Sequence, residues 1–134
     1  MGQALAVLHD QHRAVLATVR RDGHPQLSPV AAAAVEGDVF ISSRETAMKV
    51  KNLRRHPYAS LCVFGDTFFG QPWVQVEGPA AIVSLPGAMD GLVDLYRAIA
   101  GEHPDWDDFR SAMASEKRVL IRISVERAGP DRSG

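Results

Sequence analysis

The sequence has a single cysteine, few aromatic residues and almost no net charge. Cys62 is the only cysteine among 134 residues, so no disulfide can form within the chain, and we expect a reducing, cytoplasmic compartment. Its neighbours Leu61 and Val63 are apolar, which favours a buried structural thiol over a nucleophile. Fifteen basic against sixteen acidic residues give a formal net charge of −1. This balance argues against a general polyanion-binding protein, because such proteins are usually basic.

Long apolar segments and the short motifs of common enzyme classes are also missing. No apolar run approaches the length of a membrane span, and the residues after Met1 lack the charged and apolar regions of a signal peptide. There is no G-x-G-x-x-G, no Walker loop, no C-x-x-C and no G-x-S-x-G. His9 and His12 have a spacing that two metal ligands could use, but no third ligand is near, so we interpret them as solvated histidines and expect no metal site.

The composition is that of one globular domain, with 46% hydrophobic and 23% charged residues over positions 1–134. Alternating and apolar runs predict strands at residues 13–19, 25–33, 39–42, 58–64, 73–83 and 119–126. Helical spacing predicts helices at residues 3–9, 46–56, 86–101 and 105–114, and residues 128–134 are expected to form a flexible tail. Since most strands follow one another without a helix, we predict a mainly β fold, a six-stranded antiparallel β-barrel with peripheral helices.

Two predicted strands carry side chains that could meet a ligand. Gln26, Ser28 and Val30 share one strand face, and a planar ring with carbonyl and N–H edges could bind along it; the alternative is a barrel face that meets water. An aromatic residue on a strand usually packs in the core, and we take this as the default interpretation of Trp73. The alternative is that its ring stacks on a ligand. Because Gln75 and Glu77 share its face, we expect Trp73 near a ligand or an interface and not in the barrel centre.

The segment from Ser42 to Lys49 leads from a strand into a helix. We expect Thr46 to cap that helix, which leaves Lys49 in the first turn, where the helix dipole disfavours a positive charge. A phosphate would remove the conflict by meeting the free backbone amides, the hydroxyls of Ser42 and Ser43 and the ammonium of Lys49. The alternatives are a solvated basic face and a nucleic-acid surface, and the second is disfavoured because residues 41–57 contain no aromatic ring on which bases could stack.

Several of these residues together resemble a known family. They are the turn and strand Asp22-Gly23-His24-Pro25-Gln26-Leu27-Ser28, the strand end Ile41-Ser42-Ser43, and the K-x-x-N-L-x-x-x-P run from Lys49 to Pro57. Over about residues 5–126 the chain resembles the split β-barrel flavin-binding family typified by pyridoxamine 5′-phosphate oxidase. Residues 95–109 resemble its branch of actinobacterial oxidoreductases that use the deazaflavin cofactor F420.

The resemblance implies a split barrel that forms a homodimer with cofactor sites at the interface. It implies that Lys49 holds the cofactor phosphate and that Gln26, Ser28, Val30 and Ser42 line the ring and ribityl chain. Members of the branch often carry a second basic residue two positions before this lysine, where the chain has Ala47. We expect Arg44 or a residue of the partner subunit to replace it.

The implied activity is an F420-dependent oxidoreduction, with hydride transfer between the deazaflavin and a small conjugated substrate at a C=C or C=N bond. The cofactor supplies the chemistry and the protein positions it, so we assign no catalytic residue and expect solvent to supply the proton. One alternative keeps the fold and binds FMN in place of F420. The other is a cofactor-binding protein without catalytic activity.

Overall fold

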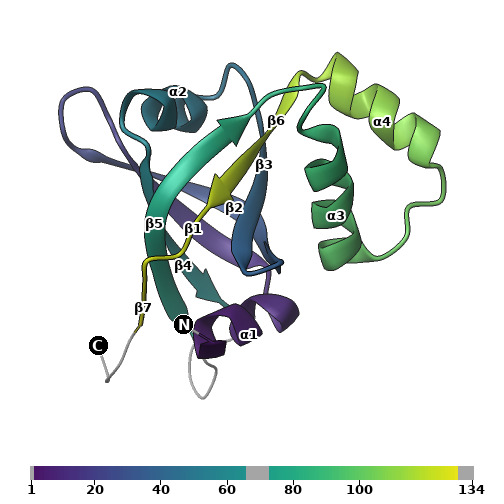
Figure 1. Ribbon diagram of the computed structural model, residues 1–134. Helices are drawn as coiled ribbons and strands as arrows, with labels where there is room; N and C mark the ends of the chain where they lie inside the picture. The colour runs from purple at the N-terminus through teal and green to yellow at the C-terminus, as the bar shows by residue number, and fades with distance from the viewer. Residues whose placement is uncertain (1, 66–72, 130–134) are drawn as a thin grey trace.

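The computed structural model describes residues 2–65 and 73–129 (Figure 1). The elements along the chain are α1 (Gly2–Asp10), β1 (Arg13–Val19), β2 (Pro25–Val35), β3 (Asp38–Arg44), α2 (Met48–Arg55), β4 (Tyr58–Phe64), β5 (Val74–Val83), α3 (Met89–Ala100), α4 (Trp106–Ser115), β6 (Arg118–Ile123) and β7 (Arg127–Gly129). None of the described helices is both long and apolar enough to cross a membrane.

Six antiparallel strands close into a barrel in the order β4-β1-β2-β3-β6-β5, with β5 pairing back to β4. The predicted six-stranded antiparallel barrel is therefore confirmed. The predicted flexible tail is wrong for its first residues, because Ala128 and Gly129 belong to β7 and pair with Val76 and Gln75 of β5. The backbone of β5 offers these residues hydrogen bonds that a local sequence pattern does not reveal. The rest of that tail, residues 130–134, lies outside the described residues.

The barrel interior is built from alternate strand residues, as the period of two requires. Its largest fully buried side chains are Leu16, Val39, Ile41, Leu61, Val63, Val76, Ile121 and Ile123. Helix α1 packs against β2 and β5 at one end of the barrel, and α2 packs against β1 and β5 at the other (Figure 1). Buried Leu8 of α1 and buried Val50 and Leu53 of α2 join the same apolar core. Both ends of the barrel are thus closed by helices.

Helices α3 and α4 form a second, smaller core against the outside of the barrel. Leu92, Leu95 and Phe109 pack there with Ala33 of β2 and Leu120 of β6. The sequence predicted that β6 is buried on one face only, and that is wrong at Leu120, because α3 covers the outer face of the barrel at this point. Helix α3 begins at Met89 and not near residue 86, because residues 85–88 form a turn.

Candidate functional site

A cavity of about 350 Å³ opens where β3 ends and α2 begins. Its polar lining comes from three elements and is here called the basic cradle: Ser42, Ser43 and Arg44 of β3, Lys49 of α2, and Arg118 of β6. Ala47 and three residues of β2 complete the wall next to these groups, namely Pro29, Val30 and Ala31. The structure therefore brings five of the eight sequence-predicted site residues together, namely Val30, Ser42, Ser43, Arg44 and Lys49.

The first turn of α2 has free backbone donors beside this cavity, and its Lys49 lines it. The predicted Thr46 cap is wrong: Ala47 is the N-cap residue, with φ −65° and ψ 143°, and no side chain caps the helix. Val50 N and Lys51 N donate to the Ala47 carbonyl, whereas the amides of Met48 and Lys49 have no acceptor within the helix. The first turn contains no acidic residue. Its positive dipole end is thus uncompensated, and it points to an anionic ligand.

The charges around the cradle also favour an anion. Arg44 and Arg118 are direct cross-strand partners on β3 and β6, an arrangement that is unfavourable for like charges. Glu116 partly relieves it, because its Oε1 accepts from Arg118 Nε at 2.9 Å and lies 3.7 Å from a terminal guanidinium nitrogen of Arg44. Lys49 has no acidic partner within the described ranges. Among the described residues of the cradle, the two arginines therefore share one carboxylate and Lys49 has none, so an anion would complete the balance.

The other three predicted site residues lie elsewhere. Gln26 lies on the other side of α2, in an open cavity with Lys51, and its Oε1 accepts from Asn52 Nδ2 at 2.9 Å. Ser28 is half-buried on β2 and lines neither cavity. Trp73 is 41% exposed next to Val74, which begins β5, whereas the strand reaches the cradle region at its other end. Within one subunit, Trp73 is therefore outside the core and remote from the cradle.

Asn52, from the K-x-x-N-L run, acts as a structural link. Its side chain is 1% exposed, and its Nδ2 donates to Thr18 Oγ1 at 3.1 Å as well as to Gln26. Its Oδ1 accepts from an Arg55 guanidinium nitrogen at 3.1 Å. These bonds tie α2 to β1 and β2, and so they fix the helix whose first turn forms the cradle.

Replacing Asn52 is expected to destabilise the fold. In Asn52→Ala the Gln26 carbonyl and the Thr18 hydroxyl lose their donor in a buried setting, which lowers the free energy of unfolding by about 1–3 kcal/mol. Urea denaturation measures the change. The exposed neighbour Lys51 is the matched control, and Lys51→Ala should stay within about 0.5 kcal/mol of the wild type. Equal midpoints for Asn52→Ala and Lys51→Ala would contradict the structural role.

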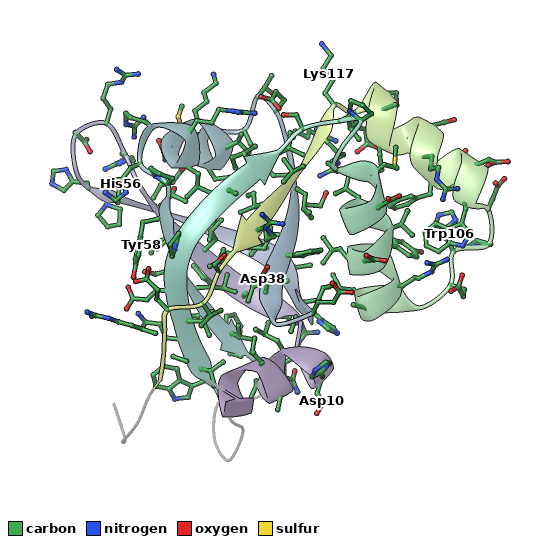
Figure 2. The ribbon with its side chains drawn as sticks, in the orientation of Figure 1. Asp10, Asp38, His56, Tyr58, Trp106 and Lys117 are labelled. Atoms are coloured by element: carbon green, nitrogen blue, oxygen red, sulfur yellow. The ribbon has the colours of Figure 1, made fainter. Side chains whose placement is uncertain are left out.

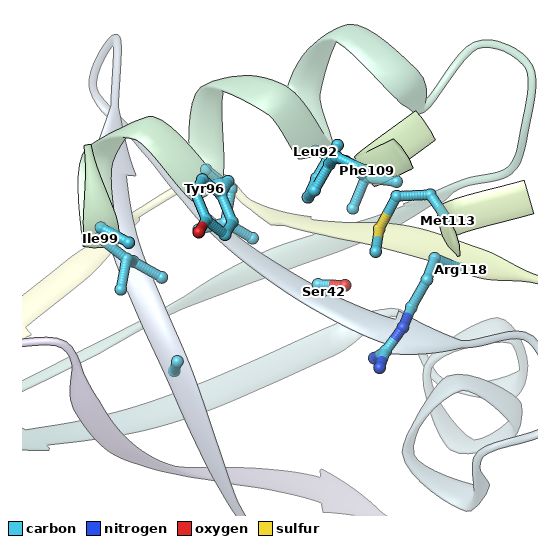
Figure 3. A pocket seen from close by; sticks show the side chains of 10 residues that line it. Ser42, Leu92, Tyr96, Ile99, Phe109, Met113 and Arg118 are labelled. Atoms are coloured by element: carbon cyan, nitrogen blue, oxygen red, sulfur yellow. The ribbon is translucent and has the colours of Figure 1, made fainter. Parts of the chain in front are cut away.

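A second cavity of about 340 Å³ adjoins the cradle and is here called the apolar pocket. Figure 3 shows it between α3, α4 and the barrel, with Tyr96 and Ile99 on one helix and Phe109 and Met113 on the other. The two cavities share three lining residues: Ala31, Ser42 and Arg118. The two cavities therefore adjoin each other, and together they are here called the groove, with a basic end and an apolar end.

Sequence reasoning did not identify Arg118 or the walls of the apolar pocket. Arg118 stands just before the predicted last strand, and only the pairing of β6 with β3 places it opposite Arg44. Leu92, Tyr96 and Ile99 have the spacing of an ordinary packing face on a helix. The one available signal was the family-like stretch of residues 95–109, which contributes Tyr96, Ile99 and Phe109 to the wall.

An aromatic cluster supports the outer wall of the apolar pocket. The rings of Tyr96 and Phe109 have centroids 5.3 Å apart, and Trp106 lies 5.8 Å from Tyr96 and 5.4 Å from Phe109. Figure 2 shows Trp106 at the start of α4, beside α3. Trp106 Nε1 donates to Glu102 Oε2 at 3.0 Å. Edge-to-face packing of this kind holds rings in fixed orientations, so the wall is preformed.

The remaining candidates from the sequence do not form a reactive site. Within the described ranges no group of three possible metal ligands is found. His9 is exposed as predicted, but the prediction of a solvated ring is wrong for His12, which is half-buried and donates from Nδ1 to the Ala32 carbonyl at 2.8 Å. Cys62 is half-buried and not fully buried, because it lies on the outer face of β4. Burial still raises the pKa of its thiol, which disfavours the reactive thiolate.

Comparisons with known proteins agree with this geometry. The family model described as pyridoxamine 5′-phosphate oxidase matches residues 1–130. A conserved hypothetical protein from Mycobacterium tuberculosis is 26% identical, with a TM-score of 0.79 over 99% of this chain and 90% of that chain. An F420 reductase is 22% identical (TM-score 0.69, 92% and 94% covered), and a heme binding protein from Mycobacterium smegmatis is 18% identical (TM-score 0.74, 97% and 54% covered). The last two likenesses show the fold alone.

Proposed function

The chain belongs to the pyridoxamine 5′-phosphate oxidase family, and we propose that within it the protein is an oxidoreductase that uses the deazaflavin F420. It transfers a hydride between that cofactor and a small conjugated organic substrate. The observation that carries the proposal is the groove in which a basic cradle at the start of α2 adjoins an apolar pocket. Such a groove suits a cofactor with a phosphate at one end and a second, apolar ligand beside it.

The cradle has the donor set that a cofactor phosphate needs. The free amides of Met48 and Lys49, the hydroxyl of Ser42 and the ammonium of Lys49 all belong to one short segment. Arg44 adds a guanidinium group, and it supplies the positive charge that Ala47 lacks. Hydrogen bonds between such cations and phosphate oxygens are stronger than neutral ones.

The choice of F420 over FMN rests on fewer residues than the phosphate site does. Both cofactors carry a phosphate after a ribityl chain, so the cradle suits either. Residues 95–109 resemble the F420-using branch, and they form part of the apolar pocket. The fold of the F420 reductase is compatible with this choice.

The chain contributes binding and orientation to the reaction. When it is bound and reduced, the deazaflavin supplies a hydride from ring carbon 5. Lys49 and the amides of α2 hold the phosphate, and the apolar side chains of Phe109 and Met113 exclude water from the adjoining pocket. Neither cavity is lined by a described carboxylate or imidazole. We therefore expect solvent to supply the proton that the substrate takes up together with the hydride.

A fluorescence titration with F420 and FMN at equal concentrations tests this proposal. We expect the protein to bind F420 more tightly than FMN, and we expect the bound, reduced cofactor to be oxidised by conjugated acceptors. Tighter binding of FMN would assign the cradle to a flavin. Tight binding of F420 without turnover on any acceptor would favour a non-catalytic cofactor carrier of the same fold.

We also propose that two copies of the chain form a homodimer through the outer face of β1, β2 and β4. Helices leave the first part of β2 uncovered on this face: Leu27 is 65% exposed, and Pro29 and Ala31 are also exposed, whereas Ala33 packs beneath α3. Val15 pairs with Pro29 on one side and with Cys62 on the other, so the apolar surface continues across the strands. Interfaces of obligate homodimers are apolar surfaces of this kind.

A charge placed on this face should separate the subunits. We expect the wild type to sediment with twice the 14.6 kDa mass of the chain and Leu27→Arg to sediment as a monomer at micromolar concentration, because burying an unpaired guanidinium in an apolar interface is costly. Ala98→Arg, on the exposed side of α3, adds the same charge elsewhere and should remain dimeric. A monomeric wild type would exclude the proposed dimer.

A further inference from the structure

We propose that the apolar pocket binds the hydride acceptor and that this acceptor is a conjugated molecule with one anionic group, held at the Arg118 end. This inference rests on the proposed function, because it names the second ligand of the same groove. It assigns the body of the acceptor to the space between α3 and α4 and its charged end to the boundary with the basic cradle.

The walls of the pocket suit a flat apolar body. Leu92, Ile99, Phe109 and Met113 supply aliphatic, aromatic and thioether surface, and Tyr96 presents its ring from α3 (Figure 3). The volume of about 340 Å³ lies within the usual range for small-molecule sites, about 300–1,000 Å³. Mutual packing with Trp106 orients the rings of Tyr96 and Phe109 that line this space.

The polar groups of the pocket gather at one end. Arg118 and Ser42 lie together at the barrel side of the pocket (Figure 3). The Arg118 side chain is only 26% exposed, and its contact with Glu116 is shared with Arg44. A guanidinium that is partly withdrawn from water next to an apolar cavity attracts a carboxylate or sulfonate more strongly than an exposed one does. The ligand that complements this pocket therefore has one negative end.

The position of the pocket favours the acceptor over the cofactor ring. A deazaflavin ring has carbonyl and N–H edges that need polar partners, and the apolar pocket offers few of them beyond its boundary. The cradle side has Ser42, Ser43 and the edge of β2 at Val30. A ligand in each cavity would meet at Ala31, Ser42 and Arg118, which both cavities share. Hydride transfer needs such contact, with the reacting atoms about 3–3.5 Å apart.

Trp106 is a built-in reporter for this pocket, because its ring contacts Tyr96 and Phe109, which line it. The chain has two tryptophans, so a Trp73→Phe background isolates the Trp106 signal. The probes are anilinonaphthalene sulfonate, which has an aromatic body and one anionic group, and phenylnaphthylamine, which has the same body without the anion. Comparison of the two separates the contribution of the charge from that of the apolar surface.

We expect both probes to change Trp106 emission and the sulfonate to bind at least about tenfold more tightly than the neutral probe. Arg118→Met should weaken binding of the sulfonate by about 10–100-fold and leave the neutral probe unchanged. Arg122→Met is the matched control, because Arg122 lies on the same strand outside the pocket and should leave both affinities unchanged. With F420 present at saturation, the sulfonate should still bind.

Three results would overturn the inference. One is equal affinity of wild type and Arg118→Met for the sulfonate. Another is displacement of the sulfonate by F420 in direct competition, which would assign the apolar pocket to the cofactor ring. The third is probe binding without any change in Trp106 emission, which would place the probe elsewhere. The probe titrations need no cofactor. A failure of F420 to bind would therefore contradict the proposed function, whereas the probe titrations would still decide whether the apolar pocket binds an anionic ligand.

Discussion

The Lys49→Ala variant should bind F420 about 10–150-fold more weakly than the wild type, because it loses a charge-assisted hydrogen bond worth about 1.5–3 kcal/mol. Lys49 is in the first turn of α2, lines the basic cradle and has no acidic partner among the described residues. The free energy of unfolding should stay equal or rise slightly. Removing a positive charge from the first turn relieves a conflict with the helix dipole of about 0.3–1 kcal/mol. Fluorescence titration gives the affinity, and urea denaturation gives the stability.

Lys51→Ala is the control for this prediction. Lys51 is two residues further along α2 and lines the open cavity on the other side of the helix, with Gln26 and Asn52. It should therefore affect F420 binding far less. A cofactor without its phosphate should bind to wild type and Lys49→Ala almost equally. If Lys49→Ala binds intact F420 as tightly as the wild type does, the phosphate does not bind in the cradle.

Gly78→Ala should destabilise the protein by about 3 kcal/mol or more, the largest effect on stability that we expect from removing or adding a single methyl group. A Cβ at this position of β5 would lie 1.8 Å from the carbonyl oxygen of Ser124. That backbone is not free to move away, because Ser124 N donates to the Pro79 carbonyl and Glu126 N donates to the Glu77 carbonyl. Thermal and urea denaturation report the loss.

The matched control is Gly87→Ala, in the turn before α3. The nearest atom to an added Cβ there is the Ser84 carbonyl oxygen at 3.6 Å, an ordinary contact. Its φ is not in the left-handed region, so alanine fits without strain and should leave stability equal or slightly higher. Equal stability of Gly78→Ala and the wild type would mean that β5 and the segment after β6 do not approach each other as described.

The strands of the barrel could be predicted because their alternation is a property of consecutive residues. Val119, Ile121 and Ile123 face the interior of the barrel, as the sequence pattern indicates. The burial of Leu120 could not be predicted in the same way, since it depends on α3 covering that strand from outside. The pairing of Ala128 with β5 likewise depends on a strand distant in the sequence.

The same distinction applies to the site. Ser42, Ser43, Arg44 and Lys49 lie within one short segment, so a strand followed by a helix is enough to bring them together. Alternation correctly predicted that Gln26 shares a strand face with Ser28 and Val30, but it could not show that the side-chain oxygen of Gln26 accepts a hydrogen bond from Asn52.

The residues that sequence reasoning missed come from distant elements. Arg118 reaches the cradle only through the pairing of β6 with β3. Tyr96 and Met113 form the apolar pocket only because α3 and α4 pack side by side on the barrel. These contacts arise from tertiary packing, which no local pattern encodes.

A crystal structure of the protein with F420 bound tests the central claim most directly. We predict that the phosphate lies at the start of α2, with its oxygens within about 2.7–3.2 Å of Lys49 Nζ and of the amides of Met48 and Lys49. The apolar pocket between Tyr96 and Met113 should remain free for the acceptor. A phosphate bound among Arg20, Arg21 and Lys51 on the other side of α2, or a deazaflavin ring filling the apolar pocket, would contradict the account.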